Sequence, residues 1–594
     1  MRTLLILCAF SLCVSHLCAQ PYGEPDRGQP GDEMIQEYLA QEALRLDAQF
    51  AEDFASRENW EANRARYKEE YLYMLGLWPL PEKSPLKATI TGMIERDGYV
   101  VENLHYQSKP GLYVTANVYR PATRQPGEKF PAVLYVCGHG GGGRDGVKTV
   151  YQSHPIWLAK HGFVCLIVDT LELGEIVADD MHHGTFDLER WWWHSRGYTS
   201  AGVECWNGVR GIDYLLSRED VDPENLGVTG ISGGGAATFW IAAADERIKV
   251  AIPISGMADL ESYVGNRVIN GHCDCMFLYN TFQWPWTRIA ALIAPRPMLF
   301  INSDNDRIFP MDANERITNR LERFYNLYGA SDKFDTVVSV GGHAYREDIR
   351  RATFGFLQYH LQGKADPIND TELDLVDKDA KPPTYPIPPE QLRVFPTDAD
   401  LPTDAINVTI DEHFVPIAQP ELPKAGEYDV WRQKMLAELQ RVTFRSLHQV
   451  EKPLSLVEPW TRRNPPNYVE RSFALLGSTA DTWRLHENRG FGISPDQQLT
   501  GGDGLTRAYG AIYQEHEKLI RGISLTNPPT THMDPNAPQF LNILRVCDVP
   551  DMLGLLAPRP LKIVTRQPQA FERTSKIYEA AGAKSAFSLE TLAE

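Results

Sequence analysis

A serine stands between glycines in the run Gly230-Ile-Ser232-Gly-Gly234, directly after an apolar stretch and before a helical one. A sharp strand-to-helix turn of this kind lifts a serine hydroxyl to the edge of a sheet, and its glycines avoid collisions with neighbouring backbone. The turn also brings the side chain to a helix N-terminus, where developing negative charge is stabilised. We therefore predict that Ser232 is a nucleophile.

A serine hydroxyl is a weak nucleophile unless a base lies beside it. His343 is the expected base, because it follows an apolar stretch in a Gly-Gly-His-Ala run and comes last in the chain order serine, acid, histidine. The acid is expected in the loop 303–310. Its Asp-x-Ile-x-Pro pattern favours Asp306, and Asp304 is the alternative if it does not brace the loop instead. Either carboxylate would orient His343 and stabilise its imidazolium form.

Acyl transfer also needs backbone N–H groups that bind the developing oxyanion. Gly233, the residue after the nucleophile, is one expected donor. A second loop, Cys-Gly-His-Gly-Gly-Gly-Gly over residues 137–143, follows an early apolar stretch. We expect Gly140 or Gly141 to supply the other donor.

The segment from Glu172 to Trp206 is rich in aromatic and charged residues and lies between two expected strands. Aromatic stacking and charged hydrogen-bonding groups would suit a sugar, so this segment and the glycine-rich loop offer candidates for a substrate pocket: His139, Glu175, His183, Trp193 and Arg196. The alternative is a structural insertion whose tryptophans pack into a local core.

Metal ligands are not expected. Cys273-Asp-Cys275 lacks a second cysteine pair at zinc spacing, and no spacing rule links His182, His183 and Glu175. The serine chemistry requires no organic cofactor.

These residues need a scaffold that brings several loops to one edge of a sheet. Residues 33–77 have helical spacing, and residues 99–120 alternate like antiparallel strands. Short apolar runs then alternate with helical segments, which predicts an α/β fold: a mostly parallel sheet flanked by helices. The expected strands are 131–136, 163–169, 226–229, 250–255, 298–302 and 336–340; the expected helices are 206–216, 234–244, 313–328 and 346–361.

The expected domain order begins with a signal peptide over residues 1–19, where one positive charge precedes a short apolar run and a small residue. A helical lead-in (20–98), a catalytic domain (99–375), a proline-rich linker (376–425) and a second, truncated hydrolase-like α/β domain (426–594) follow. The linker is expected to be extended, because its prolines break helices and central strands.

An internal echo supports the second domain. Ala-Pro-Arg-Pro precedes an apolar stretch at 294–297 and again at 557–560, and Tyr-x-x-x-Gly-Ala follows both copies in the same order. A duplicated unit is the favoured interpretation, and chance recurrence of a strand-initiating motif is the alternative. The second copy lacks a serine elbow and an acid loop.

Charge and export limit the partners. The formal net charge of −19 argues against nucleic acid and anionic membranes. We expect a secreted or periplasmic protein, with no membrane attachment after signal cleavage. Three of the nine cysteines fall in the signal peptide, and any pairing among the other six is left open.

From about residue 75 to 361 the sequence resembles the acetyl-xylan-esterase-like branch of the α/β-hydrolases. The resemblance rests on the 138–143 loop, Arg196-Gly-Tyr-Thr, the elbow 230–234, the acid loop 302–310, Gly342-His343 and His272-Cys-Asp-Cys-Met276. It implies a carboxylesterase acting on an acylated polysaccharide or oligosaccharide. A tyrosine common in the oxyanion loop of that branch is absent here.

Other functions fit parts of the pattern. A prolyl-oligopeptidase-like peptidase would use the same triad but normally carries a long propeller before it. A glucuronoyl esterase would carry arginine where this chain has Gly233. A carbohydrate-binding scaffold without catalysis is the favoured role for residues 426–594.

Overall fold

The computed structural model of the chain describes residues 32–445 and 522–592, apart from 54, 177, 179–181 and 186. It also describes 455–463, 468–476, 482–490, 498–500, 505, 508, 509 and 512. The expected signal peptide lies outside the described residues. The helical lead-in forms α1 (Asp32–Ala48), α2 (Phe50–Asp53) and α3 (Arg57–Met74). These helices pack on the main body, where the Asp53 carboxylate accepts a hydrogen bond from Arg288 at 2.8 Å.

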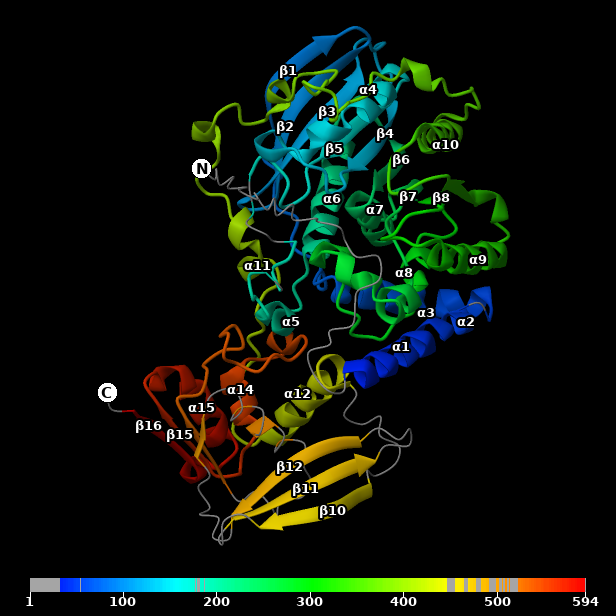
Figure 1. Cartoon of the computed structure of the whole chain (residues 1–594). Helices are drawn as coiled ribbons and strands as arrows, with labels where there is room; N and C mark the ends of the chain where they lie inside the picture. Colours follow the sequence, from blue (N-terminus) through cyan, green and yellow to red (C-terminus); the bar gives the residue numbers. More distant parts are fainter. Residues whose placement is uncertain are drawn as a thin grey trace, which may run out of the picture.

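A nine-stranded sheet has the strand order β1-β2-β3-β5-β4-β6-β7-β8-β9. Figure 1 shows β1 to β8 in the upper body, above the C-terminal segment. Pairs from β1 to β5 across β2 and β3 are antiparallel, and all later neighbours are parallel. This confirms the mostly parallel sheet. The strands are β1 (Thr89–Arg96), β2 (Tyr99–Lys109), β3 (Leu112–Pro121), β4 (Phe130–Val136), β5 (Val164–Val168), β6 (Val221–Ile231), β7 (Val250–Ile254), β8 (Met298–Ser303) and β9 (Phe334–Ser339).

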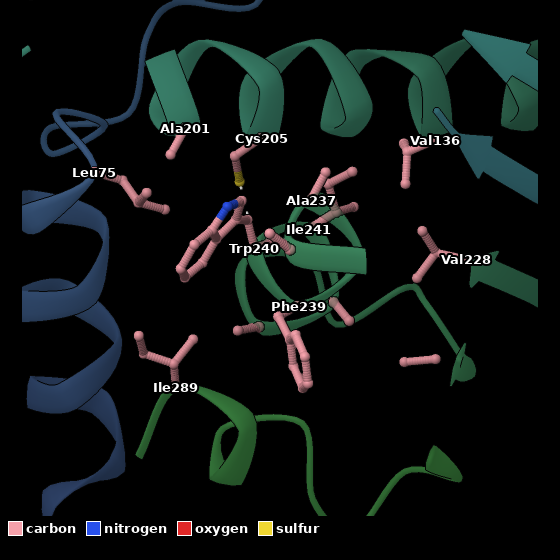
Figure 2. Packing of buried hydrophobic residues seen from close by; sticks show 14 of the residues in the cluster. Leu75, Val136, Ala201, Cys205, Val228, Ala237, Phe239, Trp240, Ile241 and Ile289 are labelled. Carbon is pink, nitrogen blue, oxygen red and sulfur yellow. Dashed lines mark hydrogen bonds between the residues drawn. The ribbon is translucent and has the colours of Figure 1, made fainter. Parts of the chain in front are cut away.

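Helices cover the sheet. Those packed on its strands are α4 (Ser153–Lys160), α6 (Ser200–Ser217), α7 (Gly233–Ala244), α9 (Met311–Leu327) and α10 (Glu347–Leu357). Two shorter helices, α5 (Trp192–Arg196) and α8 (Thr287–Ala291), pack mainly against other helical segments. Figure 2 shows the buried contact of α6 with α7, in which the Cys205 thiol donates to the Trp240 carbonyl at 3.4 Å. A methyl group at Gly208 would lie 2.2 Å from Ile241, so glycine permits this close helix packing.

The proline-rich stretch is tied along the antiparallel end of the sheet. The Asn103 amide donates to the carbonyls of Gln391 and Arg393, and Leu392 is fully buried. The stretch has no long helix or strand, but it is less extended than expected, because it contains three short 3-10 helices (Pro389–Leu392, Asp398–Asp400 and Asn407–Thr409) and a one-turn helix, α11 (Ile410–His413). Because of these contacts the stretch lies bound to the surface of the main body and is not a free tether.

The C-terminal segment contains α12 (Tyr428–Val442), α14 (Val549–Gly554) and α15 (Glu572–Ala580). One sheet is antiparallel, with strands β10 (Ser455–Arg463), β11 (Tyr468–Leu476) and β12 (Thr482–Gly490). A second sheet is parallel, with β13 (Gln498–Thr500), β14 (Ile523–Thr526), β15 (Leu561–Thr565) and β16 (Phe587–Thr591).

The sequence echo has matching local structure. Tyr325 donates its hydroxyl to the Arg296 carbonyl at 2.7 Å, and Tyr578 donates to the Arg559 carbonyl at 2.8 Å. In both places a helix then connects two neighbouring parallel strands, β8 to β9 and β15 to β16. Duplication remains a prediction, and these shared contacts support it.

Within the described residues, no helix is long and apolar enough to cross a membrane. The six cysteines outside the expected signal peptide are all buried and free. Cys165 lies within β5 and Cys137 directly follows β4, as expected for thiols that pack in a core.

Candidate active site

Ser232 occupies the turn between β6 and α7 with φ 61° and ψ −124°, a conformation that non-glycine residues rarely adopt. The backbone around it is crowded. A methyl group at Gly230 or at Gly234 would lie 2.2 Å from the Val136 carbonyl oxygen. Glycine is therefore required on both sides, and the turn presents a half-buried Ser232 at the carboxyl end of the sheet.

His343 and Asp306 meet at this same edge. His343 Nδ1 lies 2.7 Å from Asp306 Oδ2. The other Asp306 oxygen, Oδ1, accepts from the backbone N–H groups of Ile308 and Phe309. The Asp306 side chain is fully buried, whereas that of His343 is 30% exposed. A carboxylate held on three sides can therefore orient an imidazole whose other nitrogen, Nε2, is not engaged by Asp306.

The alternative acid, Asp304, has a different role in this structure. Its Oδ1 accepts from the Gly341 N–H at 2.7 Å, so it joins the acid loop to the histidine loop. Arg346 reinforces the same junction by donating to the Ser303 hydroxyl and to the Gly342 carbonyl. The geometry therefore pairs His343 with Asp306 and leaves Asp304 as a brace.

The glycine-rich loop lies against the serine, but not through the residues that we expected. A methyl group at Gly138 would lie 3.2 Å from the Ser232 Cβ and 2.4 Å from the Ile231 carbonyl oxygen. Gly140 donates its N–H to the Gly138 carbonyl at 2.9 Å, so this N–H is already engaged within the loop, and Gly140 as an oxyanion donor stays a prediction that the loop geometry does not favour. A methyl group at Gly141 would have nothing within 4 Å, which places this glycine on the open side of the loop.

Three of the expected pocket residues are structural instead. Glu175 is 1% exposed and accepts from the Lys148 ammonium and from two backbone N–H groups of the proline-rich stretch. Trp193 is fully buried and donates from Nε1 to Asp411. Arg196, 5% exposed, donates to the Val415 carbonyl. All three hold the proline-rich stretch in place, which corrects their assignment to substrate binding.

His183 and His139 differ in surroundings. His183 is exposed, and its Nδ1 lies 3.9 Å from Asp187. His139 packs its ring over Gly233, where a methyl group would lie 2.7 Å from His139 Nε2. It is therefore in contact with the elbow itself.

His139 also joins a group of side chains that the sequence analysis did not connect. Its ligating atoms and those of His182, Cys273 and Cys275 all lie within 4.8 Å of one another. The sequence analysis expected no metal ligands, and it did not foresee that these four side chains, all of metal-ligand type, lie together. They come from three separate loops, so no local spacing could have revealed them.

Charges are unusual within this group. Hydrogen bonding from Cys275 and contacts with His139 hold the pKa of Cys273 well below its ordinary value. Burial and the nearby Cys273 charge raise the pKa of Cys275. Burial alone would lower the pKa of His182, but the hydrogen bond and charge of Glu204 outweigh it and raise the pKa to about 9.

A protein-family model matches the part of the chain that carries Ser232, Asp306 and His343. Residues 151–364 match the prolyl oligopeptidase family, and this region spans the elbow, the acid loop and His343. The chain is a serine hydrolase of the α/β-hydrolase superfamily. A Bacillus subtilis protein described as a hydrolase, YtaP, is 27% identical to it over 315 residues, which are 50% of this hydrolase and all of YtaP.

Two solved structures are similar to part of the chain. Methylesterase BT1017 has a TM-score of 0.47 and 23% identity, with coverage of 63% of this hydrolase and 77% of that chain. A glucuronoyl esterase from Solibacter usitatus has a TM-score of 0.42 and 16% identity, with coverage of 52% and 94%.

Proposed function

We propose that the chain is a secreted serine carboxylesterase that removes acyl groups, acetyl in the first instance, from a carbohydrate. The observation that carries the proposal is the 2.7 Å contact between His343 Nδ1 and the buried Asp306, at the sheet edge that presents Ser232 in its strained turn.

The proposed reaction uses the nitrogen of His343 that Asp306 does not engage. Because Nδ1 faces Asp306, Nε2 is the nitrogen that takes the Ser232 proton as the hydroxyl attacks the ester carbonyl. His343 then returns this proton to the leaving alcohol, and water releases the acid from the acyl-enzyme by the reverse roles.

The oxyanion that forms during attack needs two donors. Gly233 begins α7, so its N–H belongs to the helix terminus, where an anion is stabilised. Among the loop residues, His139 is the better candidate for the second donor, since it follows Gly138 and packs on Gly233. The N–H of Gly141 is the alternative on the open side of the loop.

An acylated carbohydrate fits the exposure of the site. Ser232 is half-buried and His343 exposed, so an ester on a bulky chain could approach the dyad without entering a deep channel. Lys378 adds a polar group beside the loop, with its ammonium 3.4 Å from the place a Gly140 methyl would take. The choice of acetyl as the acyl group rests on the resemblance of the elbow and loops to acetyl-xylan-esterase-like enzymes.

The first test replaces the nucleophile. Ser232→Ala should lower hydrolysis of p-nitrophenyl acetate at least about 10³-fold, while Ser217→Ala, a change at the end of α6, should leave it unaltered. Unchanged hydrolysis by a folded Ser232→Ala protein would refute the proposed mechanism. Acetate release from acetylated xylan then tests the substrate class.

A peptidase is the second candidate, because the family match is to prolyl oligopeptidases. Against it, the described residues before β4 form helices and three antiparallel strands rather than a propeller. Cleavage of a prolyl peptide substrate in preference to acetylated xylan would favour the peptidase. Methanol release from a methyl glucuronate ester would favour a glucuronoyl esterase.

Export and the C-terminal segment complete the proposal. Cleavage near residue 19 would be seen as a new N-terminus in protein collected outside the cytoplasm. We propose that residues 426–594 support the catalytic body or bind carbohydrate without catalysis. Retardation of the Ser232→Ala protein in xylan-containing gels would test such binding.

A further inference from the structure

Four ligand-type side chains meet behind the glycine-rich loop. Cys273 Sγ and Cys275 Sγ lie 3.1 Å apart, and each lies 3.3 Å from a ring nitrogen of His139. The His182 ring stacks on that of His139, with centroids 4.3 Å apart. A tetrahedral zinc ion with thiolate and imidazole ligands needs about 3.3–3.8 Å between its ligand atoms. The four side chains therefore need only small movements to surround one ion.

We propose that His139, His182, Cys273 and Cys275 bind one divalent transition-metal ion, and that zinc is the metal which their chemistry fits. Two sulfur and two nitrogen ligands in a compact group favour tetrahedral zinc. With all four positions filled by the protein, the ion would have a structural role and no open position for substrate.

Charge and burial agree with a cation at this place. His182, Cys273 and Cys275 are all buried. Two thiolates balance one divalent cation, so the occupied site would carry no net charge from these groups. Binding would release each proton that the ligand atoms still carry, from S–H groups as metal–thiolate bonds form and from the His182 nitrogen that becomes a ligand.

The surroundings of His182 also suit a ligand. Glu204 lies 3.0 Å from Nε2 and Glu172 lies 3.2 Å from Nδ1. A histidine that binds a metal through one nitrogen commonly donates from the other to a carboxylate, which fixes the ring. Whichever nitrogen binds the ion, one glutamate remains to hold the other.

The position of the site suggests what the ion does. His139 belongs to the glycine-rich loop and lies on Gly233, while Cys273 and Cys275 belong to a loop that also contacts the acid loop through His272 and the Ile308 carbonyl. An ion would therefore link the glycine-rich loop to the loop of Cys273 and Cys275, which in turn contacts the loop that holds Asp306. This role rests on the proposed esterase function, but metal binding itself does not.

The decisive measurement is the metal content of the full mature chain, purified without metal-affinity resin and passed over a chelating column. Mass spectrometry of the elements should find about one zinc ion per chain in the unaltered protein. Cys273→Ser and Cys275→Ser should each lower this at least about tenfold. The control Cys547→Ser removes an equally buried thiol of the C-terminal segment and should retain the metal.

Other outcomes would overturn the proposal. Metal-free protein that takes up neither Zn²⁺ nor Co²⁺ on titration would do so, as would full metal content in both cysteine variants. A disulfide between Cys273 and Cys275, detected by mass after alkylation without reductant, would also refute it.

A second readout covers variants that fail to fold. The unaltered protein loaded with Co²⁺ should show thiolate-to-cobalt charge-transfer absorption, and the lack of these bands would contradict the ligand set. Ser232→Ala should keep one ion per chain. A failure of the esterase proposal would appear as unchanged hydrolysis in Ser232→Ala, independently of its metal content.

Discussion

Replacing Asp306 by asparagine tests the pairing at the centre of the proposed mechanism. The carbonyl oxygen of the new amide could still accept from the N–H groups of Ile308 and Phe309, so the loop should keep its shape. The amide nitrogen would then face His343 Nδ1, where Asp306 Oδ2 now lies at 2.7 Å. Since an amide N–H cannot accept a proton, it would favour the tautomer with Nδ1 unprotonated and Nε2 protonated.

The cost follows from this tautomer. A protonated Nε2 cannot take the Ser232 proton, and no carboxylate remains to stabilise an imidazolium. We expect kcat to fall about 10⁴-fold, or about 5 kcal/mol of transition-state stabilisation, with little change in KM. The unfolding midpoint should change little, because the backbone contacts of the acid loop are conserved.

The matched control is Asp304→Asn. Its oxygen can still accept from the Gly341 N–H, so the brace between the two loops should persist. Hydrolysis of p-nitrophenyl acetate should then fall by no more than about threefold, within the range of ordinary surface changes. The reasoning fails if Asp304→Asn is the more damaging of the two, or if folded Asp306→Asn retains more than a tenth of the activity.

Three further predictions concern the surroundings of the site. Gly138→Ala should abolish most activity, because its methyl group would lie 2.4 Å from a backbone oxygen, whereas Gly141→Ala has open space and should remain active. Equal activities would contradict this loop geometry. Burial lowers the pKa of His154 to about 3, so folding favours its neutral form. The free energy of unfolding should therefore fall as pH falls below 6.5, by about 2 kcal/mol at pH 5. The urea midpoint of His154→Gln should depend less on pH than that of the unaltered protein. A pKa of His154 near 6.5, measured by NMR, would refute the effect of burial. Trp193→Phe should cost about 1–3 kcal/mol in urea unfolding through its lost bond to Asp411, with KM unchanged; a raised KM without destabilisation would return Trp193 to the substrate pocket.

The central sheet was predictable because its parallel strands are buried on both faces and read as apolar runs. The expected runs coincide with β4 to β9 within a few residues. β1 was missed, since its residues are mostly exposed and lack apolar alternation at the edge of the sheet. The short α5 was also missed, because five residues carry too little periodicity to identify a helix.

Some features of the site follow from residues close together in the sequence, and others depend on contacts between distant residues. Asp306 could be favoured over Asp304 from sequence, because loop position and a proline-bounded pattern are local properties. The burial of Glu175 could not be predicted from sequence. It depends on Lys148 and on backbone N–H groups that lie more than two hundred residues later in the chain. His139 and Cys273 are likewise 134 residues apart, so only the fold brings them together.

Arg545 joins the C-terminal segment to the helical lead-in. This residue donates to the carbonyls of Tyr73 and Trp78 at 2.6 and 2.7 Å, and its guanidinium lies 3.3 Å from the centre of the Tyr73 ring. Arg545→Ala should therefore cost about 2–4 kcal/mol of unfolding free energy, through two charged hydrogen bonds and a cation–π contact. Since Tyr73 lies at the end of α3, the loss should lower the unfolding temperature of the whole chain.

Activity measured below the unfolding transition distinguishes a structural role of Arg545 from a role in catalysis. Arg545 is absent from the proposed triad and oxyanion loop, so kcat and KM for p-nitrophenyl acetate should equal those of the unaltered protein below the transition. Arg559→Ala changes an arginine of the same segment outside this contact and is the matched control. If Arg545→Ala lowers kcat without any loss of stability, the segment acts on the chemistry itself. If the variant instead unfolds in two separate steps with the first body unaffected, the two parts do not stabilise each other.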